Sequence, residues 1–257
     1  GPSREDGSVA GLDPACARQA VTSPNLPTSW GIIEATPLAE GVGGQVWRTR
    51  RRNGEAVVIK RVSAQAAADA AHATAYLDWR DGRGAVRLLA VDGDWQMQED
   101  AGERTLAHVL DQDGDVAATL IAAEVLQVLH APLDRPAEGL QTMTDRFAAL
   151  VAAAGREGGL FAEAGDCLKT LAGGPVLPLH GDLHHDNILF GGRGWLVIDP
   201  HGLIGDPGYD AANLLYNPLE RQDLRTDPAR ARRLAEVLAP AVQRPVAAVL
   251  GYGFCHA

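Results

Sequence analysis

The sequence predicts an α+β protein of two lobes, a small lobe rich in β-strands followed by a larger, mainly helical lobe. Short β-like runs punctuated by glycine fill residues 25–99. From Val116 to His130, apolar residues recur at three- and four-residue spacing, as on one face of a helix. A polar segment that contains Gly102 separates the two patterns. We therefore expect the first lobe over residues 25–99 and the second over residues 100–257.

The first lobe is expected to contain one helix, with strands before it and after it in the sequence. The alanine-rich stretch over residues 64–75 has high helix propensity and no helix-breaking residue. The runs before and after it are rich in β-branched and apolar residues and end at glycine or polar turns. Strands are therefore predicted over residues 30–33, 46–50, 56–62, 85–91 and 95–99.

The second lobe is expected to be mainly helical. Asp113 or Asp115 is a candidate cap for the helix over residues 116–130, and Pro132 follows its end. Further helices are predicted over residues 143–154 and 160–171, around Leu234 to Leu238, and, interrupted, over residues 246–257. Short buried strands are predicted over residues 176–179, 188–190 and 195–198.

Composition and charge limit the classes of partner. The net charge is −10, which argues against a nucleic-acid partner, because such proteins present a basic face. The same charge suits a cationic small-molecule substrate, although it also serves simple solubility. No apolar run approaches the roughly 20 residues that cross a membrane, so no membrane partner is expected. Nothing in the sequence indicates an oligomeric state.

The first residues and the cysteines indicate the cellular setting. Residues 1–24 are small and polar without the apolar core of a signal peptide, and we expect a flexible tail or a remnant of expression or processing. The three cysteines, Cys16, Cys167 and Cys255, lie far apart without metal-ligand spacing. Such unpaired thiols favour a reducing, cytoplasmic location.

The most informative segment runs from His180 to Asn187 and reads His-Gly-Asp-Leu-His-His-Asp-Asn. Asp182 follows a strand-like run, Asn187 comes next in the same loop, and Asp199 ends another apolar strand. Transfer of a γ-phosphoryl group needs a base for the attacking hydroxyl and metal ions that neutralise the phosphates. The pattern matches the kinase catalytic loop, with Asp199 at the place of the metal-binding aspartate.

Each of these residues also has an ordinary structural interpretation. Asp182 alone would suit a helix cap, Asn187 a turn, and Asp199 the end of a strand. Their occurrence together, in this order and at kinase spacing, favours the catalytic interpretation. The sequence thus predicts Asp182 as catalytic base and Asn187 and Asp199 as ligands of Mg²⁺, in a fold like that of the protein kinases.

A glycine-rich segment near the amino end is the second signal. Gly41, Gly43 and Gly44 precede a strand that contains Lys60. Glycines let the backbone approach a triphosphate closely, and a lysine on a rigid strand can pair with its phosphates. Any β-hairpin can carry three glycines, so this signal depends on the catalytic loop downstream. Together they predict ATP as cofactor, bound by these glycines and Lys60.

The segment from Leu179 to Asn217 resembles the aminoglycoside phosphotransferases, most of all the branch of streptomycin 6-phosphotransferases and hydroxyurea kinases. Elsewhere the resemblance depends on the glycine loop, Lys60 and the order of the lobes. It implies a bilobal kinase-like fold, ATP with magnesium, and phosphorylation of an antibiotic hydroxyl, which confers resistance. It also implies that a hinge from Gln98 through Glu99 to Ala101 contacts adenine.

The sequence departs from the kinase pattern at the partner of Lys60. No glutamate lies between Arg61 and Gln98, and Asp69 is the nearest acid in the predicted helix, so Lys60 is paired with Asp69 or with nothing evident. The carboxyl end is the other departure, because the resemblance implies further helical sequence that closes the substrate site beyond the interrupted helix over residues 246–257. Structural roles are expected for His184 and His185, and hydrogen bonds to backbone amides of the catalytic loop for Asp210. A solvated loop position is favoured for His201, with contact to phosphate or substrate as the alternative.

The acceptor is left open between several small molecules. A protein kinase is disfavoured because Asp210 follows Asp199 closely and no Ala-Pro-Glu motif appears there. An aminoglycoside such as streptomycin is the first expectation, and acids of the second lobe are candidates for its site: Asp145, Glu157, Glu163, Asp166 and Glu220. Hydroxyurea, another metabolite, or a nucleotide-binding module without turnover are the alternatives.

Overall fold

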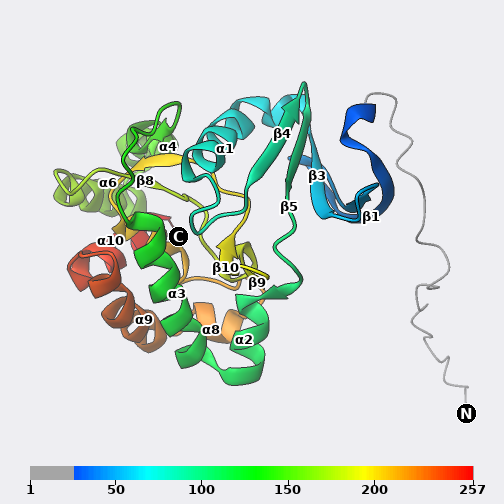
Figure 1. The fold of residues 1–257 in the computed structure, drawn as a ribbon. Helices are drawn as coiled ribbons and strands as arrows, with labels where there is room; N and C mark the ends of the chain where they lie inside the picture. The colour runs from blue at the N-terminus through cyan, green and yellow to red at the C-terminus, as the bar shows by residue number, and fades with distance from the viewer. Residues whose placement is uncertain (1–25, 257) are drawn as a thin grey trace, which may run out of the picture.

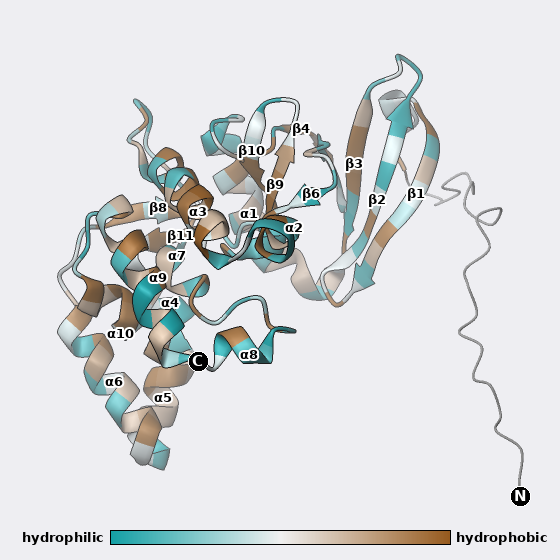
Figure 2. Cartoon of the chain, turned by 90° about the horizontal axis from the view of Figure 1, so that it is seen from below, coloured by the Kyte–Doolittle hydropathy of each residue, from teal (hydrophilic) through white to brown (hydrophobic). Residues whose placement is uncertain are grey.

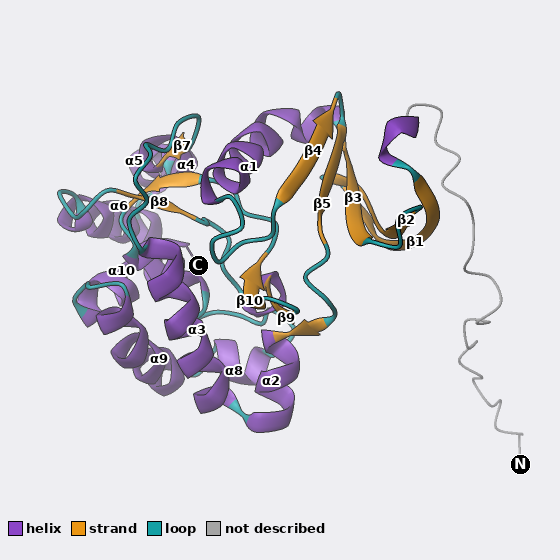
Figure 3. Cartoon of the chain, in the orientation of Figure 1, coloured by secondary structure: helices purple, strands orange, loops and turns teal. Residues whose placement is uncertain are grey.

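A computed structural model describes residues 26–256 of the chain. The predicted tail over residues 1–24 lies outside the described residues, as does Ala257. Strands gather in the amino-terminal part and helices in the carboxyl-terminal part (Figures 1 and 3). The predicted α+β arrangement, with a β-rich region followed by a larger helical region, is confirmed. The boundary between residues 99 and 100 stays a prediction.

The amino-terminal part is built on a five-stranded antiparallel sheet with the order β1-β2-β3-β5-β4. One helix, α1, follows β3 and lies beside β4 (Figure 1). The elements of this part are η2 (Thr28–Trp30), β1 (Ile32–Gly41), β2 (Gly44–Arg51), β3 (Ala56–Val62), η3 (Ala64–Ala66), α1 (Ala67–Arg80), β4 (Leu88–Asp92) and β5 (Trp95–Glu99).

Alternation along β3 gives the sheet one apolar face and one polar face. Val57 and Ile59 are fully buried and pack against Trp30, Trp95 and Met97. Because successive side chains of a strand point to opposite faces, Lys60 projects from the other side of the sheet. The sheet therefore presents the amine of Lys60 away from its own core.

The carboxyl-terminal part consists of helices and two small three-stranded sheets, ordered β10-β9-β6 and β7-β11-β8. Its helices are α2 (Leu106–Asp113), α3 (Asp115–His130), α4 (Met143–Arg146), α5 (Ala148–Glu157), α6 (Gly159–Leu171), η4 (His185–Asn187), α7 (Gly208–Asn213), α8 (Gln222–Arg225), α9 (Pro228–Ala241) and α10 (Val246–His256). Its strands are β6 (Arg104–Thr105), β7 (Gln141–Thr142), β8 (Leu177–Leu179), β9 (Ile188–Gly191), β10 (Gly194–Val197) and β11 (Leu203–Gly205).

The main core lies around α3. Leu126 and Leu129 of this helix are buried together with Leu183, Ile188 and Val197, which flank the predicted catalytic residues. Figure 2 colours much of α3 in the brown of apolar residues. Burying a leucine side chain contributes about 1.5–3 kcal/mol, so this packing holds the loop of Asp182 on a rigid base.

Most predicted elements are present, and several boundaries were wrong. The first strand begins at Ile32 instead of residue 30 and extends through Gly41, and the helix predicted over residues 64–75 begins as η3 and continues to Arg80. The cap of α3 is Gly114, without a side-chain cap, instead of Asp113 or Asp115. The single helix predicted over residues 143–154 is two, α4 and α5, and α2 was missed.

No single helix among the described residues combines the length and apolar character needed to cross a membrane. Helices α9 and α10 would satisfy both criteria only if taken together, and they meet at an angle of 120°.

Candidate active site

Two loops carry the predicted catalytic residues, and four hydrogen bonds hold these loops together. One loop, residues 180–187, follows β8, and the other, residues 198–202, follows β10. The backbone oxygen of His180 accepts from the N–H groups of His201 and Gly202, at 2.8 and 3.1 Å. The Ile198 N–H donates to the Asn187 oxygen at 3.0 Å, and His180 Nε2 lies 2.8 Å from the Ile198 oxygen. The positions of Asp182 and Asp199 are thereby coupled.

Asp210 of α7 holds the first loop in place. Its carboxylate accepts from the N–H groups of His180 and Gly181, at 3.0 and 2.7 Å, and lies 3.0 Å from His130 Nε2. Burial alone would raise the pKa of Asp210, but the hydrogen bonds from His130 and the backbone outweigh it, and the pKa lies below its ordinary value. The expected bonding of Asp210 to backbone amides is confirmed.

The Asp182 side chain is partly exposed and lies among one amide and two imidazoles. Asn187 Nδ2 donates to the Asp182 backbone oxygen at 2.9 Å and lies 3.4 Å from Oδ2. His184 Nε2 and His201 Nε2 lie 3.7 and 3.8 Å from the same Oδ2. His184 caps η4 through the Asp186 N–H, as its expected structural role requires. His185 is buried, also as expected.

Lys60 pairs with Asp199 across the two parts of the chain. The distance from Lys60 Nζ to Asp199 Oδ1 is 3.2 Å. Neither alternative expected for Lys60, Asp69 or no partner, holds, because its partner is Asp199, although Asp69 of α1 borders the same cleft. Asp199 adopts a left-handed backbone with φ of 51°, which is unusual for a residue other than glycine and is concentrated at functional sites.

These side chains surround a cleft of about 530 Å³ between the sheet and the helical part. Asp182 and Asp199 form its floor, with Pro200 and His201, and Lys60 and Gly43 approach from the sheet. His201 was predicted to be a solvated loop residue. Its side chain is 37% exposed, and it also borders the cleft. The remaining lining residues are Val42, Gln65, Ala66, Asp69, Ala70 and Ala73.

The predicted glycines form the tight turn between β1 and β2. Gly41 pairs with Gly44, and Val42 and Gly43 make the turn. Gly43 borders the cleft and has open space around the position of a Cβ atom. Gly44 has φ of +125°, and a Cβ atom there would overlap the Arg61 carbonyl oxygen. Only Gly43 of the three borders the cleft.

The predicted hinge does not border this cleft. Gln98 is buried and donates to Gln96 Oε1 at 3.2 Å. Glu99 forms an ion pair of 2.6 Å with Arg193 of the β9–β10 turn, and Ala101 is buried beside Gly191. These contacts join the end of the sheet to the second part of the chain. A role of Gln98, Glu99 and Ala101 in binding adenine stays a prediction.

Asp199 at the cleft and the buried Asn187, which is not among the residues that line it, fit Mg²⁺ held jointly with phosphates. In the described range no three side chains of His, Cys, Asp or Glu form a metal cluster. Mg²⁺ is commonly bound by one or two carboxylates plus substrate phosphates, and not by a complete protein cage. Within residues 26–256, Asn187 Oδ1 and Asp199 Oδ2 have no hydrogen-bond partner from protein. Both oxygens are therefore available as ligands.

Sequence reasoning missed several polar residues beside the catalytic loop. Arg146 Nε donates to the hydroxyl of Tyr209 at 2.9 Å, and His130 lies against Asp210. Neither has a motif around it, so only the fold reveals the contact. The acids expected near a cationic acceptor do not border the cleft: Asp145, Glu157, Glu163, Asp166 and Glu220.

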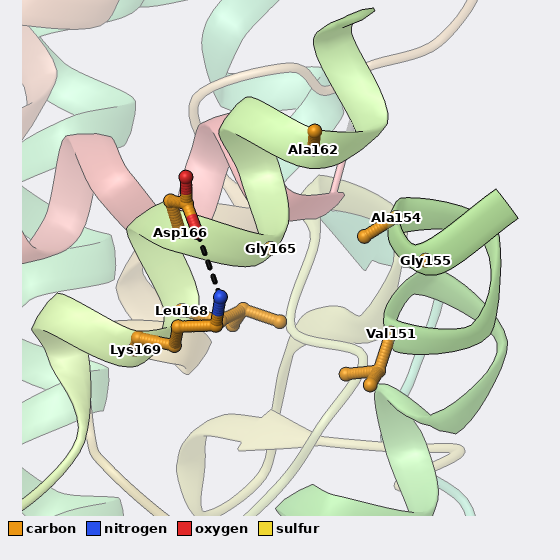
Figure 4. A pocket seen from close by; sticks show the side chains of 8 residues that line it. All are labelled: Val151, Ala154, Gly155, Ala162, Gly165, Asp166, Leu168 and Lys169. Atoms are coloured by element: carbon orange, nitrogen blue, oxygen red, sulfur yellow. Dashed lines mark hydrogen bonds and ion pairs between the residues drawn. The ribbon is translucent and has the colours of Figure 1, made fainter. Parts of the chain in front are cut away.

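Another hollow, of about 420 Å³, lies between α5 and α6 (Figure 4). Figure 4 shows small and apolar side chains such as Ala154, Ala162 and Val151 around it, with Asp166 bonded to Lys169 at the rim. The distance of that bond is 2.7 Å, so the one acid of this hollow is already paired. This hollow contains none of the predicted site residues.

Comparison with known structures gives the fold. The chain has a TM-score of 0.64 and 18% identity to an aminoglycoside-3'-phosphotransferase of type VIII, over 88% of this chain and 93% of the other. It has a TM-score of 0.60 and 18% identity to an aminoglycoside phosphotransferase of Streptomyces rimosus, solved with ADP and streptomycin, over 86% and 91%. The fold is that of these kinases, bilobal and protein-kinase-like.

Comparison with known sequences gives the family. The chain is 40% identical to the streptomycin 3''-kinase of Klebsiella pneumoniae over 158 residues, 60% of this chain and 57% of that protein. It is 34% identical to the hydroxyurea phosphotransferase of Kitasatospora aureofaciens over 203 residues, 73% of this chain and 58% of that protein. The matches thus span less than two thirds of these relatives. A family model covers residues 29–251, and the chain belongs to the family that it describes, the aminoglycoside/hydroxyurea antibiotic resistance kinases.

Proposed function

We propose that the protein transfers the γ-phosphoryl group of ATP to a hydroxyl group of a small molecule. The observation that carries this proposal is the single cleft that Lys60, Asp182 and Asp199 line together. These residues come from three separate segments of the chain, and their convergence supports a phosphoryl-transfer site more strongly than any one of them.

In the proposed reaction, Asp182 is the catalytic base. A carboxylate that is partly exposed, and that borders the cleft, can accept the proton of an acceptor hydroxyl as its oxygen attacks the γ-phosphorus. The Asn187 amide, bonded to the backbone of Asp182, holds the loop in the orientation that this transfer needs. The bond from the γ-phosphorus to the bridging oxygen of ADP breaks as the new bond forms.

Lys60, Asn187 and Asp199 are proposed to receive the nucleotide. The amine of Lys60 would contact its phosphates, and Gly43 in the β1–β2 turn leaves room for them. Asn187 Oδ1 and Asp199 Oδ2 are the proposed ligands of Mg²⁺, which when bound neutralises the charge of the triphosphate. The ion pair of Lys60 with Asp199 would then open as phosphates and metal compete for its two ends.

The first proposed acceptor is an aminoglycoside of the streptomycin type, so that the protein would confer antibiotic resistance. The 40% identity to a streptomycin 3''-kinase supports this choice, and the net charge of −10 suits a cationic acceptor. Hydroxyurea is the second proposed acceptor, supported by the match to a hydroxyurea phosphotransferase over 203 residues. The alternative of a nucleotide-binding module without turnover is disfavoured because the proposed base, Asp182, borders the same cleft as Lys60 and Asp199.

The decisive variant is Asp182→Ala, assayed with ATP, magnesium, streptomycin and hydroxyurea. Phosphorylated product is measured by mass spectrometry. We expect a rate lower by about 10²–10⁴-fold, the usual contribution of a positioned base, with normal folding and retained ATP binding. Asp186→Ala, which removes an exposed carboxylate of the same loop, is the matched control. Unchanged turnover in Asp182→Ala would remove this residue from the reaction.

A further inference from the structure

Arg146, at the end of α4, is a cation that forms no ion pair with an acid among residues 26–256. Its Nε donates to the hydroxyl of Tyr209 at 2.9 Å, and within residues 26–256 its two terminal nitrogens have no partner from protein. Among the described residues, the partly buried Arg48, Arg51 and Arg244 each pair with a carboxylate. The unused fork of Arg146 is therefore available to a ligand.

The residues around Arg146 form a polar cluster from four separate segments. Tyr209 and Tyr216 lie on and after α7, His256 is at the end of α10, and His201 belongs to the loop after β10. The ring of His256 lies 5.3 Å from that of Tyr209 and 4.9 Å from that of Tyr216. His201 Nε2, in turn, lies 3.8 Å from Asp182 Oδ2. His201 therefore lies against the proposed base, and Arg146 bonds to Tyr209 of the same cluster.

The electrostatic effects on the cluster agree with this placement. Burial lowers the pKa of His256, the charge of Arg146 lowers it further, and the charge of Asp182 opposes both effects. Burial raises the pKa of Tyr216, and Asp182 and Arg146 act on it in opposite directions. The charges of Arg146 and Asp182 therefore act on the same side chains.

The cluster does not satisfy its own hydrogen bonds. His256 Nε2, His201 Nδ1 and Asn213 Nδ2 are buried without a partner in the described part of the chain. Buried polar atoms of this kind usually bond to a water, an ion or a ligand where protein supplies no partner. A guanidinium with free donors beside neutral rings offers hydrogen bonds to oxygen, and it repels an ammonium or guanidinium.

We propose that Arg146 is a specificity-determining residue, whose guanidinium donates hydrogen bonds to a neutral or anionic oxygen of the acceptor beside the hydroxyl that Asp182 activates. An acceptor with a carbonyl next to that hydroxyl would be favoured over one with a cation there. This inference rests on the proposed function, and it shifts the preference from streptomycin toward hydroxyurea, whose carbonyl lies next to its hydroxylamine group.

The test compares kcat/KM for hydroxyurea and for streptomycin in the wild type, Arg146→Met and Arg146→Glu. We expect the ratio of the hydroxyurea value to the streptomycin value to fall on the order of tenfold in Arg146→Met, the effect of one lost hydrogen bond from a charged donor, and further in Arg146→Glu. Most of the change should lie in KM for hydroxyurea, with KM for ATP unchanged. Arg146→Lys should retain part of the ratio, because the charge stays and the planar fork is lost.

Two controls separate this role from a structural one. Arg156→Met removes an exposed cation of the neighbouring helix α5 and should leave the ratio unchanged. Tyr209→Phe removes the hydroxyl that orients Arg146 and should lower the ratio less than Arg146→Met. An equal loss with both acceptors, or a raised KM for ATP, would overturn the inference alone. A wild type without turnover of any acceptor would overturn the proposed function together with it.

Discussion

Asp210 determines the geometry of the proposed active site without bordering its cleft. It is fully buried, and two backbone N–H groups of the catalytic loop have their hydrogen bonds to its carboxylate. Removal of the carboxylate leaves these buried donors and His130 unpaired. A buried donor without a partner costs about 1–3 kcal/mol, so several of them in one place threaten the fold as well as the loop.

We expect Asp210→Ala to lower the free energy of unfolding by about 3–5 kcal/mol, measured by urea denaturation, the effect of breaking a buried charged pair. The matched control is Asp223→Ala, because Asp223 is an exposed acid whose ion pair with Arg221 spans 2.9 Å at the surface. That change should leave the free energy of unfolding nearly unaltered, because solvent screens an ion pair at the surface. Equal effects of the two substitutions would contradict the anchoring role of Asp210.

The sequence identified residues of the site where a motif fixes their order. It did not identify side-chain partners that only the fold brings together. Asp182, Asn187 and Asp199 follow one another in a short stretch, so two loops joined by backbone hydrogen bonds suffice to bring them together. Lys60 lies 139 residues before Asp199, and the sequence indicated Asp69 only because it lies close along the chain. Arg146 lacks any motif, so its contact with Tyr209 was not predictable.

At the scale of elements, the two glycines Gly43 and Gly44 in the turn between β1 and β2 differ in their backbone conformation and in the space around them. Gly44 has φ of +125° and faces the Arg61 carbonyl oxygen, whereas Gly43 has open space where a Cβ atom would lie. Both look alike in the sequence. The first is required by the fold of the hairpin, and the second is proposed to serve the approach of phosphates.

We therefore expect Gly44→Ala to lower the free energy of unfolding by about 1–3 kcal/mol, because the backbone is strained and the new methyl group meets backbone atoms. Gly43→Ala should leave stability within about 0.5 kcal/mol and raise KM for ATP. Thermal unfolding and steady-state kinetics measure the two effects. A similar loss of stability in both variants would contradict the different roles assigned to Gly43 and Gly44.

Element boundaries were predicted less well than element types, for local physical reasons. The strand β1 extends through polar residues such as Glu34 and Glu40, whose side chains are exposed, so the apolar pattern ended before the strand did. The short helix α2 begins with Thr105 as cap and buries only one side of two turns. Gly114 separates α2 from α3 with φ of 89°, where a capping aspartate was expected.

At the scale of the whole molecule, buried histidines make stability depend on pH. Burial lowers the pKa of His180, and it lowers the pKa of His185 to about 4, with the charge of Arg230 acting in the same direction and Asp115 against it. The unfolded chain has ordinary histidines with a pKa near 6.5. It therefore binds more protons than the folded protein between about pH 6.5 and pH 4.

Stability should accordingly be complete above about pH 6.5 and fall as the pH decreases below it, by up to about 1.4 kcal/mol per pH unit for each such histidine. Urea denaturation at a series of pH values measures this slope. His185→Gln should reduce the slope below pH 6.5, whereas substitution of the exposed His108 by Gln should not. A stability that rises on acidification through this range would contradict the assignment of neutral, buried histidines.

The architecture as a whole followed from the sequence, because the change from strand-like to helix-like periodicity is a property of long segments. The pairing order of the sheet, with β5 between β3 and β4, was not predicted, since it depends on contacts between distant strands. The cleft arises only when the Lys60 face of that sheet meets the loops after β8 and β10. Its chemistry was therefore predictable by motif, and its shape was not.

The central claim is that the side chains around this cleft hold one magnesium-bound triphosphate, and calorimetric titration of ATP with and without Mg²⁺ tests it most directly. We predict binding that requires Mg²⁺ in the wild type, that weakens by about tenfold or more in Asp199→Ala and Asn187→Ala, and that persists in Asp182→Ala. An ATP affinity that is the same with and without Mg²⁺, or that is unaltered in Asp199→Ala and Asn187→Ala, would contradict the account.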